Sequence, residues 1–153
     1  ENFTGTGRRF EVLYDKDGIV IVDDYAHHPT EVRATIKAAK DSGFDRVIAV
    51  FQPHRYSRVK ELYKEFGASF GDADVIIIDD IYSAWEEPIE GVSSEMIVEE
   101  IAKRGLKPLH FAANEELVAY LVKNRRPGDI LILMGAGNIR RTSEKIRDIL
   151  LGE

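Results

Sequence analysis

Apolar residues along this chain form short continuous runs that alternate with longer segments in which every third or fourth residue is apolar. Continuous runs predict strands that are buried on both faces, and periodic segments predict helices with one apolar face. The predicted strands are 10–14, 19–22, 47–51, 75–78, 109–111 and 129–134. The predicted helices are 29–39, 57–70, a segment from Ser93 or Ser94 to Gly105, a segment capped by Asn114, and 139–150.

Local signals support these boundaries. Lys16-Asp17-Gly18 is typical of a hairpin turn between the first two strands. Pro29 suits the first position of a helix, and Gly43 ends that helix. In the last helix, Ile149 is expected to point inward beside Ile146 and Leu150.

Strands that alternate with helices indicate a mostly parallel sheet covered on both faces. The opening hairpin adds an antiparallel edge strand. The sequence therefore predicts one doubly wound, Rossmann-like α/β domain with helices on both faces, and a length of 153 residues fits a single core.

Composition narrows the class of protein. Hydrophobic residues make up 44% and charged residues 31%, as in a globular domain. The longest apolar run, 130–136, is far short of the roughly 20 residues of a membrane span. The absence of cysteine excludes disulfides, thiolate zinc sites and a cysteine nucleophile, and it is consistent with the cytoplasm.

A net charge of −6 argues against a general nucleic-acid binder, so any bound anion needs a local basic cluster. Glu1-Asn2-Phe3 opens no apolar stretch, so no signal peptide is predicted. The abrupt start leads us to expect a fragment or excised domain whose first residues belong to a linker.

Functional side chains are concentrated where the predicted strands end, and ligands of doubly wound sheets bind at that edge. Four loops are expected there: 23–29, 52–58, 79–82 and 135–138. Three of the four histidines of the chain lie in the first two loops. These two loops are therefore the leading candidates for the site.

The first loop allows two interpretations. Asp23 and Asp24 either cap the following turn and helix, or Asp24 accepts hydrogen bonds from ribose hydroxyls. A zinc pair of His27 and His28 is disfavoured, because adjacent residues diverge and no third ligand is near in the sequence. A hydrogen-bonding or charge role suits these histidines better.

Arg55 and Arg58 lie three residues apart where a helix is expected to begin. They form either a solvated surface pair or an anion site. Guanidinium groups bind carboxylates bidentately, and a helix N-terminus adds backbone donors. His54 would reinforce the same positive pocket.

Glycine-rich segments give weak signals. Gly135-Ala136-Gly137 lacks the third glycine of a dinucleotide fingerprint, because position 140 is arginine. A tight turn that lets a ligand or another loop approach is the favoured interpretation. Gly5-Thr6-Gly7 does not form a Walker-type phosphate loop. Trp85 belongs either to a functional loop or to half-buried packing.

The residues alone thus indicate an α/β domain that binds an anionic ligand, with a nucleotide among the candidates. A phosphoacceptor receiver domain competes, since Asp23-Asp24 and Asp79 follow two strands. A receiver needs a lysine after the last strand, where this chain has Met134-Gly135-Ala136, so this alternative is disfavoured.

Two segments, 23–32 and 51–58, closely resemble the Mur ligases. Gln-Pro-His-Arg-Tyr-Ser-Arg at 52–58 resembles the alanine-adding members most, with the murein-tripeptide-recycling ligase as the alternative. The flanking segments 5–10, 82–89 and 135–139 match as well. The resemblance covers essentially all of residues 1–153, as the C-terminal domain of such a ligase.

The resemblance implies an ATP-dependent amide ligase of peptidoglycan synthesis, cytoplasmic and needed for cell-wall biogenesis, cell shape and division. ATP would phosphorylate the carboxylate of UDP-N-acetylmuramate, and the amine of L-alanine would attack the acyl phosphate. The implied cofactors are ATP and Mg²⁺. The phosphate loop and magnesium ligands would lie in a central ATPase domain, which residues 1–9 would adjoin.

The resemblance also assigns roles to single residues, with no metal ligand and no general base among them. Arg9 would reach the ATP phosphates, and Asp24 would contact the ATP ribose. The residues implied for the amino acid and the reacting carboxylate are Tyr25, His27, His54, Arg55 and Arg58. The turn of Gly135, Ala136, Gly137 and Asn138 would border the same pocket. The domain would close on its N-terminal and central partners as a lid, and no nucleic acid or membrane is expected to bind.

Overall fold

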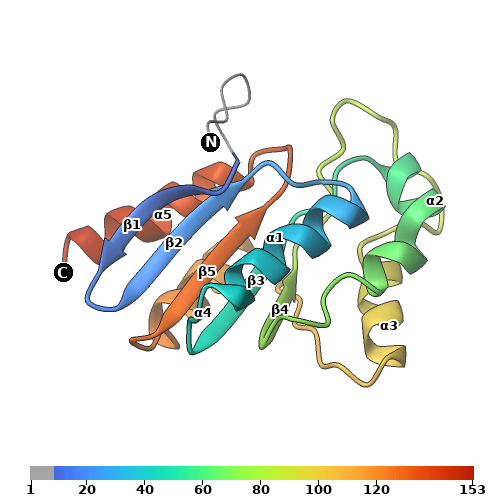
Figure 1. The fold of residues 1–153 in the computed structure, drawn as a ribbon. Helices are drawn as coiled ribbons and strands as arrows, with labels where there is room; N and C mark the ends of the chain where they lie inside the picture. The colour runs from blue at the N-terminus through green and yellow to red at the C-terminus, as the bar shows by residue number, and fades with distance from the viewer. Residues whose placement is uncertain (1–8) are drawn as a thin grey trace.

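The computed structural model describes residues 9–153, in which strands and helices alternate (Figure 1). The strands are β1 (Glu11–Lys16), β2 (Ile19–Asp24), β3 (Arg46–Phe51), β4 (Val75–Ile78) and β5 (Asp129–Met134). The helices are α1 (Pro29–Asp41), α2 (Tyr56–Gly67), α3 (Glu95–Lys103), α4 (Asn114–Lys123) and α5 (Ile139–Leu151).

The five strands form one sheet in the order β1-β2-β5-β3-β4. β1 runs antiparallel to β2, and every other neighbouring pair is parallel. The carboxyl ends of β2, β5, β3 and β4 therefore meet at one edge of the sheet. This arrangement confirms the predicted mostly parallel sheet with an antiparallel edge strand.

Alternate residues of each strand enter two separate cores. Val22, Ala49 and Ile132 pack with α1, α2 and α3, whereas Ile21 and Val50 pack with α4 and α5. Figure 1 shows α1 and α5 on opposite sides of the sheet. The prediction of helices on both faces is confirmed, and two buried faces explain why the strands are continuously apolar.

Two predicted elements are wrong in extent. The expected strand 109–111 is reduced to a single bridge between Leu109 and Ile77. Leu109 donates to the Ile76 carbonyl and accepts the Ile78 N–H, and no further residue of this segment is paired with β4. The second helix ends at Gly67 instead of Phe70, although the Phe70 side chain is fully buried in the core.

Three side chains also differ from expectation. Asn114 is the first residue of α4 and not its cap, which is Ala113, and the Asn114 amide donates to the Thr142 hydroxyl at 2.9 Å. Ile149 is 38% exposed and does not point inward. Trp85 is 96% exposed, which contradicts half-buried packing.

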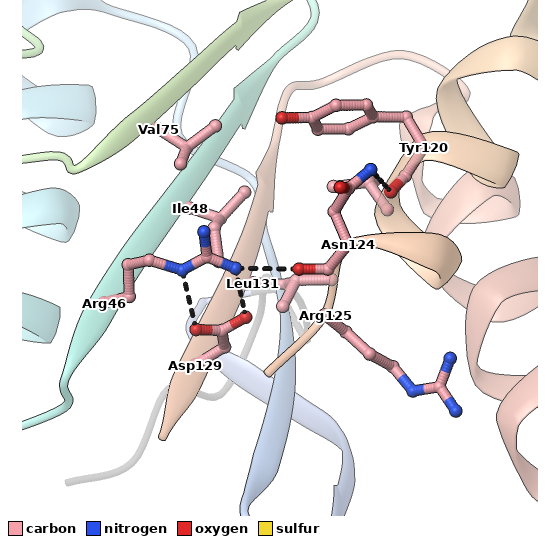
Figure 2. A pocket seen from close by; sticks show the side chains of 9 residues that line it. Arg46, Ile48, Val75, Tyr120, Asn124, Arg125, Asp129 and Leu131 are labelled. Carbon is pink, nitrogen blue, oxygen red and sulfur yellow. Dashed lines mark hydrogen bonds and ion pairs between the residues drawn. The ribbon is translucent and has the colours of Figure 1, made fainter. Parts of the chain in front are cut away.

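The amino-end edge of the sheet carries a small hollow beside the first residues of β3 and β5. Figure 2 shows the Arg46 guanidinium facing the carboxylate of Asp129 and the backbone carbonyl of Asn124. The hollow has room for about one water molecule. It is therefore a packing feature of the sheet and too small for a ligand.

Among residues 9–153, no helix combines the length and apolar character that crossing a membrane requires.

Candidate functional site

The four loops predicted at the carboxyl-end edge lie together and are joined by backbone hydrogen bonds. The Gly135 N–H donates to the Asp24 carbonyl at 3.1 Å, and the Gln52 N–H donates to the Met134 carbonyl at 2.9 Å. The Tyr82 N–H donates to the Pro53 carbonyl at 2.8 Å. These bonds fix the positions of the side chains that the loops carry.

A row of aromatic rings crosses this edge. The ring centroids of Tyr25 and His27 are 5.0 Å apart, and those of His27 and His54 are 6.1 Å apart. His54 in turn stacks on Tyr82 with centroids 5.7 Å apart. The structure thus brings together three residues that the sequence assigned to one site, although they come from different loops.

Arg58 extends this row with a positive charge. Its Nη1 lies 3.3 Å from Nδ1 of His54, and a guanidinium can only donate, so Nδ1 of His54 accepts. Burial, together with the charges of Arg58, His27 and Arg55, lowers the pKa of His54 to about 4. His54 is therefore neutral at pH 7, with its hydrogen on Nε2.

Arg55 occupies the N-cap of α2 in a strained conformation. Its φ of +76° is unusual for a residue other than glycine and costs about 1–3 kcal/mol. The Arg55 N–H donates to the Tyr82 carbonyl at 2.8 Å, which holds the backbone in place. Among the ion pairs within residues 9–153, none includes Arg55 or Arg58.

Glu86 supports the beginning of α2 from a distant loop. Its carboxylate accepts the Ser57 N–H at 3.1 Å and also the Ser57 hydroxyl. These two donors lower the pKa of Glu86. The charge of Arg55 also acts on Glu86, although no Glu86–arginine pair lies within ion-pair distance in the described part of the chain.

Glu31 organises the histidine loop at the start of α1. Its Oε1 accepts the backbone N–H of His27 at 3.0 Å and that of His28 at 3.1 Å. Burial alone would raise the pKa of Glu31, but these two donors outweigh it and lower the pKa. The same Oε1 lies 3.6 Å from Nδ1 of His27.

Asp23 and Asp24 point to opposite faces of the sheet, as neighbours on a strand must. Asp23 is fully buried 3.3 Å from Arg140. Asp24 accepts the Ala26 N–H at 2.8 Å and the Phe10 N–H at 3.0 Å. Burial raises the pKa of Asp24, and these donors oppose the rise.

Asp24 therefore caps the turn, as the first of the two interpretations expects. Its side chain is only 3% exposed, and Nε of Arg9 lies 4.0 Å away. The predicted contacts of Arg9 and Asp24 with ATP stay predictions. Gly5, Thr6, Gly7 and Arg8 lie outside the described residues.

The turn after β5 packs closely against the other loops. The Gln52 side-chain amide group donates to Oδ1 of Asn138 at 2.7 Å, and Oε1 of Gln52 accepts the Ile139 N–H at 3.2 Å. A Cβ added at Gly137 would lie 2.5 Å from the Tyr82 ring. The small residues thus permit close approach of a loop, which agrees with the favoured interpretation of this turn.

Sequence reasoning missed four residues of the site: Glu31, Gln52, Tyr82 and Glu86. All four stand inside segments that resemble the Mur ligases, 23–32, 51–58 and 82–89, so their place there was a usable signal. Tyr82 and Glu86 reach α2 only through the pairing of the loops after β3 and β4. Within residues 9–153 no three histidine, aspartate or glutamate side chains are grouped to hold a metal ion.

Comparison with known proteins shows which family has this architecture. Residues 8–137 match the profile of the Mur ligase, glutamate ligase domain. The chain belongs to the Mur ligase family. Its Mur ligase fold is also found in a solved UDP-N-acetylmuramate-alanine ligase of Thermotoga maritima, with a TM-score of 0.77 at 23% identity, covering 95% of this chain and 30% of that one.

Curated relatives are more similar in sequence. A UDP-N-acetylmuramate–L-alanine ligase of Pelotomaculum thermopropionicum is 52% identical over 140 residues, which are 91% of this chain and 30% of the relative. One of Geotalea uraniireducens is 47% identical over 152 residues, which are 99% of this chain and 33% of the relative. The chain thus spans about a third of the length of these Mur ligases.

A separately solved domain is also similar. It comes from a Haemophilus ducreyi protein that carries the name of a UDP-N-acetylmuramate:L-alanyl-gamma-D-glutamyl-meso-diaminopimelate ligase. The match has a TM-score of 0.67 at 27% identity and covers 93% of this chain and 99% of that domain. The Haemophilus ducreyi structure thus contains a domain of nearly the same extent as this chain, solved without the rest of its protein.

Proposed function

We propose that this chain is the C-terminal domain of an ATP-dependent ligase that joins L-alanine to UDP-N-acetylmuramate in peptidoglycan synthesis. The names of the curated relatives support the substrates, and the length they have beyond this chain leaves room for the UDP-sugar and ATPase domains. The observation that carries the proposal is the patch of Tyr25, His27, His54 and Arg58, on which the charge of Arg55 also acts, in a chain of net charge −6.

Arg55 and Arg58 bind the carboxylate of L-alanine. Guanidinium groups that lack a carboxylate partner in the described chain are suited to an incoming anion, and charge-assisted hydrogen bonds are about twice as strong as neutral ones. Nε2 of His54 adds a neutral donor. Tyr25 and His27 line the side of the same patch, where the amino group of alanine lies.

The ATP side of the domain lies next to β1 and β2. Arg9 reaches the ATP phosphates from the segment before β1, and Asp24 holds the turn that follows β2. A ribose contact of Asp24 requires this turn to open, because the carboxylate already bonds to the protein. Magnesium, when bound, would offset phosphate charge, and we assign its ligands to the central domain.

The domain acts as a lid. It brings the amino-acid patch to an acyl phosphate formed on the central domain, and closure excludes the water that would hydrolyse this intermediate. The turn at 135–138 borders the pocket through Gln52 and Tyr82. Such a reaction serves cell-wall biogenesis, cell shape and division, and its substrates place it in the cytoplasm.

The murein-tripeptide-recycling ligase is the second candidate, because the solved Haemophilus ducreyi domain is named as a ligase of UDP-N-acetylmuramate and the tripeptide L-alanyl-gamma-D-glutamyl-meso-diaminopimelate. The curated alanine ligases favour the first candidate with 52% and 47% identity, whereas the solved alanine ligase of Thermotoga maritima, at 23%, and this domain, at 27%, do not separate the two candidates. A receiver domain is not supported, because Asp23 is fully buried and its carboxylate is paired with Arg140.

Purified full-length protein tests the proposal. It is mixed with UDP-N-acetylmuramate, Mg²⁺ and ATP, and ADP release is measured with L-alanine, L-serine, glycine or murein tripeptide as the acceptor. We expect release that depends on L-alanine, and a product whose mass equals UDP-N-acetylmuramate plus one alanine residue. A preference for the tripeptide would favour the second candidate.

A further inference from the structure

We propose that His27 is the general base that takes a proton from the amino group of alanine, whereas His54 is a hydrogen-bond donor to the alanine carboxylate. This division of roles rests on the proposed function and extends it. The two histidines lie side by side, yet their surroundings fix opposite positions for the ring hydrogen.

The ring hydrogen of neutral His27 is on Nδ1. Nδ1 lies 2.9 Å from the backbone carbonyl of Tyr25, and a carbonyl can only accept a hydrogen bond. Nε2 therefore carries the lone pair. The His27 side chain is 19% exposed, so the ring is partly open to a ligand. A histidine whose tautomer is fixed in this way presents a base at a defined atom.

The carboxylate of Glu31 lies beside the ring of His27. Its Oε1 lies 3.6 Å from Nδ1 and is held in place by the N–H groups of His27 and His28. When Nε2 gains a proton, the nearby carboxylate offsets the new charge. The other titratable rings around His27 in the described chain are Tyr25, His28 and His54.

The hydrogen of His54 is on the other nitrogen. Arg58 donates to Nδ1, and the low pKa of about 4 keeps the ring neutral, so Nε2–H is a donor. A donor beside two arginines suits a carboxylate, and a lone pair suits an ammonium group. The amino and carboxylate groups of alanine are bonded to the same carbon, so one molecule can contact both rings.

In the chemical step, the ammonium of alanine gives one proton to Nε2 of His27. The free amine then attacks the carbonyl carbon of the acyl phosphate. A carbon–nitrogen bond forms, the bond from that carbon to the phosphate oxygen breaks, and phosphate leaves with the electron pair. The second N–H proton leaves with phosphate as hydrogen phosphate. The proton on His27 passes to water.

His27→Asn in the full-length ligase tests the assignment, because asparagine keeps an N–H near the Tyr25 carbonyl and removes the base at Nε2. We expect kcat/KM for L-alanine to fall about 10²-fold at neutral pH. The loss should shrink as the pH rises, because more of the amine is then already deprotonated. His28→Asn is the matched control, since His28 is exposed and adjacent, and it should leave kcat/KM unchanged.

Hydroxylamine as the acceptor distinguishes a general-base role of His27 from a purely structural one. It is uncharged at neutral pH and attacks acyl phosphates without first losing a proton. We expect His27→Asn to form the hydroxamate of UDP-N-acetylmuramate at the rate of the unaltered ligase, which also shows that the variant is folded. Equal losses with alanine and hydroxylamine, or an alanine loss that does not change with pH, would overturn the assignment.

The same assay keeps the two proposals apart. If the unaltered ligase forms the hydroxamate and alanine product while His27→Asn uses alanine normally, the base is wrong and the proposed function stands. If the unaltered ligase forms neither product, the proposed function fails and this inference fails with it.

Discussion

The two edges of the sheet use arginine in opposite ways. At the amino-end edge, Arg46 donates to both carboxylate oxygens of Asp129, at 2.9 and 2.8 Å, and Asp129 is 1% exposed (Figure 2). At the carboxyl-end edge, the hydrogen bonds of the Arg58 guanidinium within residues 9–153 go to the neutral ring and the carbonyl of His54. The first arginine has its anion within the fold, and the second has none among residues 9–153.

The difference separates structural charges from functional ones. A carboxylate that has left water needs its partner permanently, because an unpaired buried charge is strongly unfavourable. Cations that gather at the end of a parallel sheet without a carboxylate leave a positive field for an incoming anion. In a chain with six more acidic than basic residues, such a cluster of cations, unpaired within the described residues, supports the proposed anion site.

The largest expected effect comes from isolating the domain. The 153-residue chain should fold cooperatively, because its cores are complete and a similar domain has been solved by itself. It should neither hydrolyse ATP nor form product, because it has no phosphate loop. Circular dichroism measures folding, and an ADP-release assay measures turnover. Turnover by the isolated chain would contradict the assignment of ATP chemistry to the central domain.

At the amino-end edge, Asp129→Ala should lower the free energy of unfolding by about 3 kcal/mol or more, because it leaves Arg46 without its buried partner. Urea denaturation of the isolated domain measures the change. Asp41→Ala is the control, since Lys37 and Asp41 form an exposed pair and should contribute less than about 1 kcal/mol. Similar losses of unfolding free energy in both variants would contradict the distinction between a buried structural pair and an exposed pair.

At the carboxyl-end edge, Arg58→Ala should raise the KM for L-alanine about 10- to 100-fold, the usual range for losing a hydrogen bond to a charged group. Arg55→Ala should also raise the KM for L-alanine. Stability should change little, because neither arginine forms an ion pair within the described chain. Steady-state kinetics of the full-length ligase measure KM, with the exposed Lys60→Ala on the same helix as control. Unchanged alanine kinetics would count against the anion site.

The smallest effect is a pH dependence of stability from His54. Its pKa is about 4 when folded, against 6.5 for an unperturbed histidine, so the unfolded chain binds more protons between these values. Acidification from pH 6.5 towards 4 should therefore lower the stability of the domain. Below pH 4 this contribution should stay constant.

His54→Asn removes the titrating group, so the fall in Tm over this interval should be shallower in the variant. The comparison uses the slope of Tm against pH, because the lost stacking on Tyr82 changes the absolute value. Parallel slopes in the two proteins would show that His54 is not held neutral by its surroundings.

Sequence patterns predicted most of the fold and part of the site. The runs at 75–78 and 129–134 match β4 and β5 residue for residue, since a buried strand leaves a continuous apolar run. The strand at 109–111 was overestimated, because a short apolar run does not show whether a neighbour is there to pair with it. Ile149 illustrates the same limit on a helix, where periodicity gives a face but not how far it is covered.

By itself, the sequence determined the class of fold, the edge at which chemistry gathers and the loops that hold the histidines and arginines. These features depend on residue spacing, which is local. Only the tertiary structure decided that Asp23 and Asp24 have separate partners, that Tyr82 and Glu86 support the site, and that His27 and His54 carry their ring hydrogens on different nitrogens. The partners of Asp23 and Ser57 come from distant elements that only folding brings near. The partners of His27 and His54 are close in the sequence, but the folded loops decide which ring nitrogen faces them.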